Sequence, residues 1–306
     1  MAVKIPSSEF AVEPPGCTLR QLPEEERVAA ARTAMAVNPM NAPQRAMLPS
    51  LLATIVDEPA HLAVLTTKWW GQDGVKLSVG FLEPTSAELR RRILGFANCW
   101  GEYANVEFLE ADSPAEAQIR ISFGTGGYWS YLGTDILHVP KSQQTMNLER
   151  IGMGTSDAEC ERVVVHEFGH SAGFFHEHML PAMIALLDPE KVIAFYMPSQ
   201  GWTRQQVIQQ ILSPPPPGSI MATAEPDDVS IMCYPFPGSV TRSGKPIPGG
   251  MRISRGDAAF AAKLYPKPDA PQPPPSPPPP AGGSKVTIDI YNAERISIPG
   301  YKVVKA

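Results

Sequence analysis

The chain has 306 residues, of which 43% are hydrophobic, and this is enough to build the core of one large domain or of two modest ones. Lys and Arg number 26 against 31 Asp and Glu, and the resulting net charge of -5 excludes the basic surface on which nucleic-acid binding depends. No apolar run approaches the roughly 18 residues that a membrane-spanning helix needs. We therefore expect a globular protein with neither a nucleic-acid partner nor a membrane anchor.

The first residues, MAVKIPSSEFAVEPPGC, contain no apolar stretch followed by small residues, so no signal peptide is visible. A cytoplasmic location and secretion by a non-standard route both stay open. The four cysteines, Cys17, Cys99, Cys160 and Cys233, are too scattered for a disulfide framework and include no CxxC pair. Four reduced thiols are the simplest prediction, and a disulfide between two of them is the alternative.

In chain order, alanine-rich EEERVAAARTAMAV predicts a helix that NPMNAP ends, within an N-terminal extension of residues 1–62. LSVGF and VEFLE predict strands. Between them, a capping box over Thr85–Glu88 predicts a helix whose apolar face carries Leu89, Ile93, Phe96, Trp100 and Tyr103. Apolar and polar residues then alternate along AQIRISF, which predicts a strand with one buried face.

A second capping box, over Ser156–Glu159, opens the helix CERVVVHEFGHSA, and Gly173 is placed to end this helix in a left-handed conformation. GDAAFAAKLYP predicts a last helix that Pro266 terminates, so the folded domain is expected to span residues 63–266. Residues 267–283 form a proline-rich linker that favours an extended backbone. In residues 284–306 apolar and polar residues alternate, which predicts a short C-terminal tail resembling a β-hairpin.

The helix predicted after Ser156 contains HEFGH, whose four-residue spacing places His166 and His170 on one face, one turn apart. The string continues as HExxHxxGxxH, in which Gly173 lets the chain turn and deliver His176. Three neutral imidazoles leave the fourth position of a tetrahedral Zn²⁺ ion open to water, as in catalytic sites. Glu167 is then expected to be the general base that takes a proton from this water and passes it to the leaving amine. His178 is expected to be an exposed neighbour.

About sixty residues later the chain reads SIMCYP, from Ser230 to Pro235. Together with the zinc string this segment resembles the methionine turn of the metzincins. The runs GFFHE and SIMCY narrow the resemblance to astacin-like zinc metalloendopeptidases, and the bacterial and fungal members look closest. The resemblance implies an α+β fold: a metzincin-like two-lobed zinc protease domain with a mixed twisted sheet, a zinc-binding active-site helix and a methionine turn.

The resemblance also implies roles for single residues. Tyr234 would lie beside the zinc ion and bind the metal or stabilise the oxyanion, and Met232 would form a hydrophobic floor below the metal. RISF is similar to the family's substrate-binding edge strand, so a peptide would pair with residues 118–123. In mature family members the residue at Glu177 binds the freshly cut N-terminus, which implies cleavage near residues 60–63. The alternative is that Glu177 pairs with a nearby base.

Cys17 in the N-terminal extension is a candidate latency switch. Its thiolate could occupy the zinc position that water needs, which would make residues 1–62 a pro-segment. The alternative is an ordinary free thiol.

These features predict a zinc-dependent endopeptidase, a hydrolase of the EC 3.4.24 type that acts on proteins or peptides. One alternative is a non-catalytic interaction protein whose proline-rich tail presents PxxP motifs to SH3-type or WW-type partners. Another is a zinc hydrolase of non-peptide amides or esters. Glu167 and Tyr234 argue against the first alternative, because a pure scaffold needs neither of them.

Overall fold

The computed structural model describes residues 17–43, 66–216 and 226–268, and these belong to one compact unit. Residues 269–283 of the predicted proline-rich linker, the C-terminal tail and the predicted cleavage segment lie outside the described residues. Among the helices that the structure describes, none has the length and apolar character needed to cross a membrane.

A six-stranded mixed sheet organises the first lobe of the molecule. Its order is β1-β5-β6-β4-β2-β3, and β1 and β5 run opposite to the other four strands. The bounds are β1 (Cys17–Arg20), β2 (Val75–Phe81), β3 (Val106–Glu110), β4 (Ile119–Ser122), β5 (Tyr128–Tyr131) and β6 (Met146–Leu148). The two strands predicted from LSVGF and VEFLE are confirmed.

Strand β4 corrects one prediction. It lies between β6 and β2 rather than at an edge, and all four of its residues are buried. Arg120 in this strand is only 1% exposed, because its guanidinium donates to backbone carbonyls, among them those of Ala117, Val139 and Gln143. The outer side of β5 is occupied by β1, which pairs with it in parallel.

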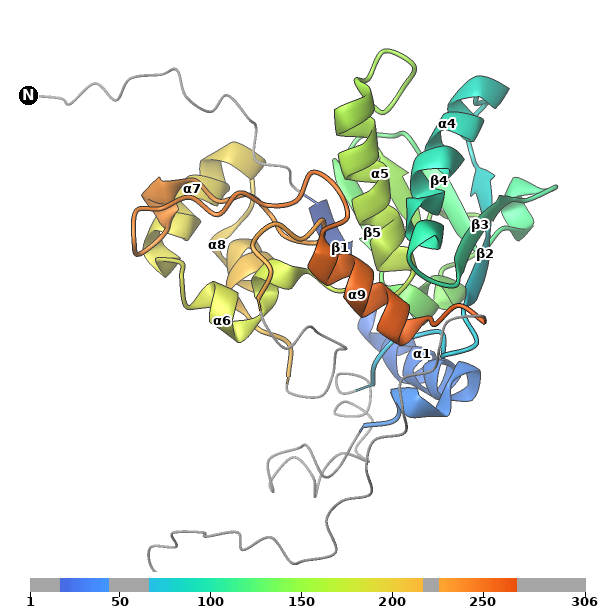
Figure 1. The fold of residues 1–306 in the computed structure, drawn as a ribbon, viewed down its shortest axis with the longest axis horizontal. Coiled ribbons are helices and arrows are strands. Elements are labelled where there is room, and N and C mark those ends of the chain that lie inside the picture. The colour runs from blue at the N-terminus through green and yellow to red at the C-terminus, as the bar shows by residue number, and fades with distance from the viewer. Residues whose placement is uncertain (1–16, 44–65, 217–225, 269–306) are drawn as a thin grey trace, which may run out of the picture. The chain divides into compact units, whose positions relative to one another are not determined.

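Helices α4 (Ala87–Ala97) and α5 (Asp157–Ser171) run side by side over this sheet (Figure 1). Ser86 rather than Thr85 caps α4, since its hydroxyl accepts from the Leu89 N–H, so the predicted capping box starts one residue too early. The helix also ends sooner than its apolar pattern suggests: a 3₁₀ turn, Asn98–Glu102, follows, and Tyr103 is 41% exposed. The Trp100 indole N–H donates to the Val165 carbonyl and ties this turn to α5.

The second lobe contains the helices between α5 and α9. Its apolar cluster includes Val192, Ile193, Val207, Ile211 and Phe236. The elements are α6 (Pro181–Ile184), α7 (Pro189–Gln200), α8 (Arg204–Val207) and a π-helical turn, η7 (Ile208–Leu212). The last helix, α9 (Arg255–Leu264), ends before Pro266 as predicted and packs into the core of the first lobe. Short 3₁₀ turns connect these elements: η1 (Pro39–Asn41), η4 (Pro114–Glu116), η5 (Gly133–His138), η6 (Glu177–Met179) and η8 (Gly238–Val240).

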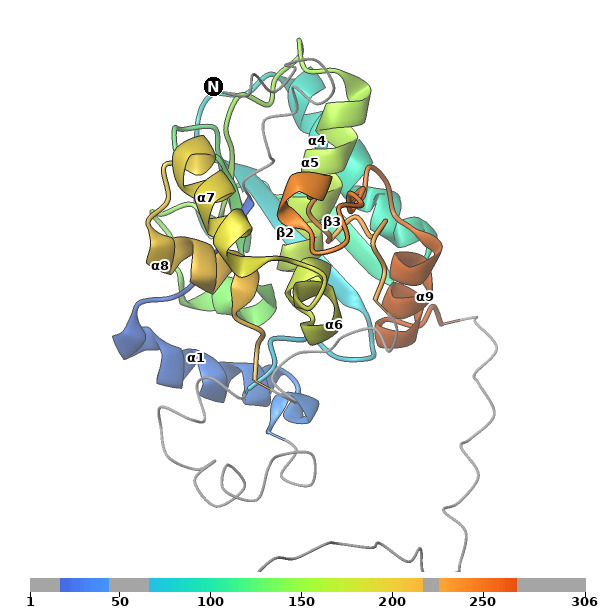
Figure 2. The ribbon, with the colours of Figure 1, turned by 90° about the vertical axis from the view of Figure 1, so that its left-hand side faces the viewer.

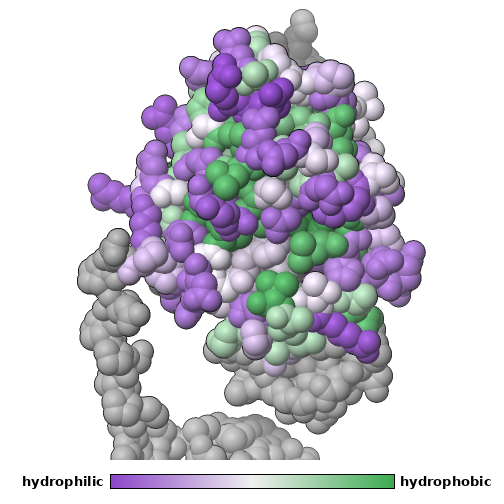
Figure 3. Space-filling model, turned by 90° about the vertical axis from the view of Figure 1, so that its right-hand side faces the viewer, coloured by the Kyte–Doolittle hydropathy of each residue, from purple (hydrophilic) through white to green (hydrophobic). Residues whose placement is uncertain are grey.

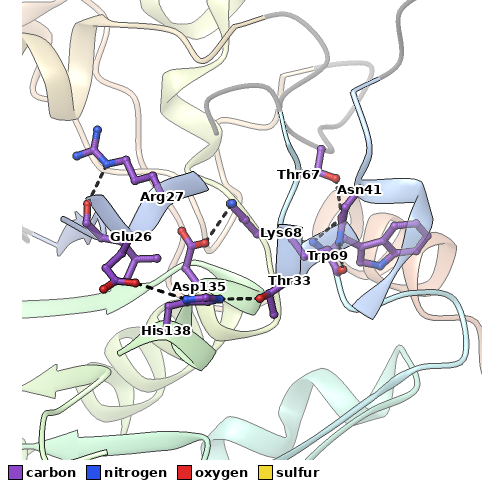
Figure 4. A network of polar contacts seen from close by, with 11 residues as sticks. Glu26, Arg27, Thr33, Asn41, Thr67, Lys68, Trp69, Asp135 and His138 are labelled. Atoms are coloured by element: carbon purple, nitrogen blue, oxygen red, sulfur yellow. Dashed lines mark hydrogen bonds and ion pairs between the residues drawn. The ribbon is translucent and has the colours of Figure 1, made fainter. Parts of the chain in front are cut away.

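The N-terminal helix α1 (Glu24–Val37) has the predicted bounds and lies at one end of the unit (Figure 2). Figure 4 shows what holds it there: His138 contacts Thr33 and Glu26 of this helix, and Asn41 lies against the segment at Trp69. Asn41 is fully buried, and its amide donates to the carbonyls of Ala34 and Trp69 and accepts from Thr67 and from the Trp69 N–H. All the hydrogen-bonding positions of this amide are therefore used.

The face on the right-hand side of Figure 1 is mostly hydrophilic, with apolar side chains scattered between charged ones (Figure 3). Isolated apolar residues of this kind are ordinary on protein surfaces.

Candidate functional site

Helix α5 positions the predicted zinc residues. Ser156 caps the helix by accepting from the Glu159 N–H, as predicted, while the Glu159 side chain binds Arg162 instead of closing the capping box. His166 and His170 lie in the last two turns of α5. Gly173, with a φ of 97°, ends the helix in the left-handed region that favours glycine, and His176 follows on the return of the chain.

The three imidazoles converge at one point. His176 Nε2 lies 3.2 Å from His166 Nε2 and 3.0 Å from His170 Nε2. The other ring nitrogens of His166 and His170 meet the carbonyls of Ile231 and Phe174, at 2.6 and 2.8 Å. A carbonyl only accepts, so Nδ1 carries the proton in both rings and the bare Nε2 lone pairs face the centre. This convergence of lone pairs is favourable only around a cation.

Burial keeps these histidines neutral. It lowers the pKa of His170 to about 4 and holds the pKa values of His166 and His176 well below 6.5. The neutral imidazole is the form that binds metal. The site therefore fits zinc on three grounds: the ligand type, the convergence of the donors and their protonation state.

Cys17 from the N-terminal extension completes the cluster. Its sulfur lies 3.5 Å from His170 Nε2, and one donor atom each from Cys17, His166, His170 and His176 fall within 4.8 Å of one another. Burial raises the pKa of the Cys17 thiol, with a further contribution from the Glu167 carboxylate, and a cation at the centre would act in the opposite direction. The sequence motif contained the histidines, but only the fold brings Cys17 to them.

Glu167 and Tyr234 line a hollow beside the cluster. Glu167 is 1% exposed, burial raises its pKa to about 8, and its Oε2 has no hydrogen-bond partner among the described residues. Burial also raises the pKa of Tyr234 well above 10.0, so the phenol keeps its proton. This phenol donates to the carbonyl of Cys17, which is a peptide carbonyl next to the metal cluster.

The methionine turn lies directly under the helix. Met232 is buried, and a Cβ on Gly169 would lie 2.7 Å from its sulfur. Asp257 of α9 holds this turn by accepting from the Ser230 hydroxyl and the Ile231 N–H. Sequence reasoning missed Asp257, although the capping box that it forms with Ser254 was a visible signal.

Glu177 and His178 directly follow the third histidine of the cluster, His176. His178 is wholly buried, so the prediction of an exposed residue is wrong: its ring stacks on Tyr234 with centroids 4.0 Å apart, and its Nε2 donates to the Gln210 carbonyl. The Glu177 side chain accepts a hydrogen bond from the Asp227 N–H.

All four cysteines lie in the described ranges and none forms a disulfide.

The two-lobed fold, its mixed sheet and the histidine cluster on α5 define the class of the protein as a metzincin-like zinc protease. Comparison with known proteins narrows this class. The structure of myroilysin is 32% identical, covers 67% of this chain and 98% of its own, and superposes with a TM-score of 0.61. A second myroilysin structure, also 32% identical, covers 65% of this chain and 86% of its own with a TM-score of 0.50.

High choriolytic enzyme 1, a hatching enzyme zinc-protease from the medaka fish Oryzias latipes, is 18% identical over 66% of this chain and 94% of its own, with a TM-score of 0.43. Neither a protein-family model nor a curated protein matches the chain. The chain belongs to the astacin-like zinc metalloproteases, and its cofactor is one zinc ion.

Proposed function

We propose that the protein is an endopeptidase of the EC 3.4.24 type in which His166, His170 and His176 hold the zinc ion and Glu167 is the general base. The observation that carries this proposal is the convergence of three buried, neutral imidazoles beside a buried carboxylate. When bound, zinc supplies Lewis-acid chemistry, by lowering the pKa of water and polarising the scissile carbonyl.

The residues of the chain supply the rest of the reaction. Glu167 accepts a proton from the attacking water and delivers it to the leaving amine, a role that suits the raised pKa of its carboxyl group. Tyr234 donates to the oxygen of the scissile carbonyl, and its bond to the Cys17 carbonyl shows the same donor meeting a peptide carbonyl. Met232 forms the floor on which α5 rests at Gly169.

The N-terminal extension, residues 1–62, acts in this proposal as a pro-segment of the catalytic domain, residues 63–266. Cys17 takes the fourth metal position, which leaves none for water. Strand β1 pairs with β5 and covers the edge that a peptide substrate would use. Activation therefore requires β1 to leave, and cleavage near residues 60–63 would release it.

The test compares the full chain with Glu167→Ala before and after limited proteolysis. Both proteins should contain one zinc ion, and the activated parent should hydrolyse unstructured casein about 10² to 10⁴ times faster than the variant. Equal rates would rule out Glu167 as the general base. A zinc-loaded, activated parent that cuts no protein would instead favour hydrolysis of another amide or ester.

A further inference from the structure

We propose that Gln210 is a substrate-binding residue that grips the backbone of an extended peptide on the side opposite β5. This inference deepens the proposed endopeptidase function and rests on it. The observation behind it is the environment of β1, which is an extended peptide running past the metal cluster.

Strand β1 is held along both of its edges. On one side it pairs in register with β5, with Leu19 opposite Ser130. On the other side, the Leu19 N–H donates to Oε1 of Gln210 at 3.3 Å. Successive N–H groups of a strand point to opposite edges, so this bond uses the edge that the sheet leaves free.

The second lobe fixes Gln210 in place. Val207 and Ile211, which flank it, are fully buried in the apolar cluster of that lobe. The carbonyl of Gln210 accepts from His178, whose ring stacks on Tyr234. The side-chain amide of Gln210 is therefore presented from a packed segment of the second lobe, which contacts Tyr234 beside the metal cluster through His178.

A substrate that replaces β1 meets the same two walls. Its backbone can pair with β5 along one edge only, and the groups on its other edge would lose water without gaining a partner. A primary amide has both a donor and an acceptor, so Gln210 serves an N–H or a carbonyl, whichever way the substrate runs. The Cys17 carbonyl, which accepts from Tyr234, lies where the scissile carbonyl of a substrate is expected. Leu19 lies two residues beyond Cys17, or about 7 Å along a strand, so Gln210 would bind the substrate about two residues from the scissile bond.

The test uses the full chain activated by limited proteolysis, with Gln210→Leu, which keeps the bulk and removes the amide, and with Gln209→Leu at the exposed neighbouring position as the matched control. For a peptide with three or more residues on each side of the cut, Gln210→Leu should lower kcat/KM about fivefold, the effect of one neutral hydrogen bond, while Gln209→Leu leaves it unchanged. Two further series of peptides keep only one residue on one side of the cut, either before it or after it. In one of these two series Gln210→Leu should no longer lower kcat/KM, because the residue that Gln210 binds is missing.

A second measurement does not depend on turnover. Fluorescence anisotropy measures the Kd of a labelled long peptide for each variant in a Glu167→Gln background. Gln210→Leu should raise this Kd about fivefold, and Gln209→Leu should leave it unchanged. Should Gln210→Leu fail to fold, Gln210→Asn, one methylene shorter, takes its place. Equal Kd values for parent, variant and control, or no peptide binding at all, would overturn the role of Gln210. If Gln210→Leu weakens peptide binding but the activated protein with Glu167 intact cuts no peptide, the result would support the binding role of Gln210 and contradict the proposed endopeptidase function.

Discussion

Gly169, one residue before His170, shows how closely the helix rests on the methionine turn. A Cβ at this position would lie 2.7 Å from Met232 Sδ and 3.1 Å from the Trp100 ring. Alanine in a helix interior gains about 1 kcal/mol over glycine. Forcing a methyl group into a packed core costs about 1 to 3 kcal/mol, and the clash should therefore outweigh the propensity.

We therefore expect Gly169→Ala to lower the free energy of unfolding by about 1 kcal/mol, as measured in urea. In a Met232→Ala background the same change should be close to neutral, because the obstructing sulfur is gone and the gain in helix propensity then offsets the remaining close contact with Trp100. Identical effects in the two backgrounds would show that Met232 does not support the helix at this point.

Single residues also show where sequence reasoning stops. The histidine spacing and the positive φ at Gly173 follow from local rules, and the structure has both. The burial of His178 and the contact between Gln210 and β1 depend on segments that are distant in the sequence. No period or motif within one segment contains that information.

At the level of elements, the turn between β4 and β5 depends on an acidic residue. Glu149 accepts from the N–H groups of Gly127 and Gly126, at 2.7 and 3.0 Å, and both glycines have positive φ. These two backbone bonds, that of Gly127 first, lower the pKa of Glu149 below 4.5. A carboxyl group whose pKa is depressed by folding stabilises the protein above its unfolded value and loses this contribution as the pH falls through its folded value.

Glu149→Gln should therefore reduce the free energy of unfolding at neutral pH, and the reduction should shrink as the pH falls below 4.5 and through the lowered pKa of the folded state. Urea unfolding across this range measures the difference, and Glu116→Gln, at an exposed position on η4, serves as the control. A deficit for Glu149→Gln that stays constant with pH would show that the carboxylate charge is not what holds the turn.

The elements themselves divide into those that the sequence predicts and those that it does not. Helices α1 and α9 end where expected because proline follows each of them within two residues. Strand β1 was not predicted, because its four residues become a strand only by pairing with β5, far along the chain. The central place of β4 was missed for the same reason, since strand order is set by pairing partners rather than by local pattern.

At the level of the whole molecule, the metal cluster links the N-terminal extension to the two lobes. Zinc that binds only the folded chain stabilises it, by about 3 kcal/mol when its concentration is 100 times its Kd. Removing zinc from the full chain with a chelator should therefore lower the Tm, and Cys17→Ser should reduce this dependence, because in the proposed latent form Cys17 is one of the four donors. Differential scanning calorimetry with and without chelator measures both effects.

Cys99→Ser provides the control for this experiment, since Cys99 is half-buried and lies outside the cluster. Because β1 still covers the edge of β5, the Cys17→Ser protein should need the same proteolytic activation as the parent. A Tm that ignores the chelator, or one that falls equally in the parent and in Cys17→Ser, would contradict the place of Cys17 at the metal.

In the proposed function a substrate takes the place of β1 beside β5, and the four-residue length of this pairing limits what the enzyme can cut. A chain that occupies this place must be fully extended over about 13 Å, with both of its backbone edges free to bond. In a helix or an internal strand of a folded protein, these backbone N–H and C=O groups are already hydrogen-bonded within that protein. The rate at which a protein is cut should therefore follow the free energy of opening a short stretch of its chain, so that the stability of the target, as much as its amino-acid sequence, determines which bonds are cleaved.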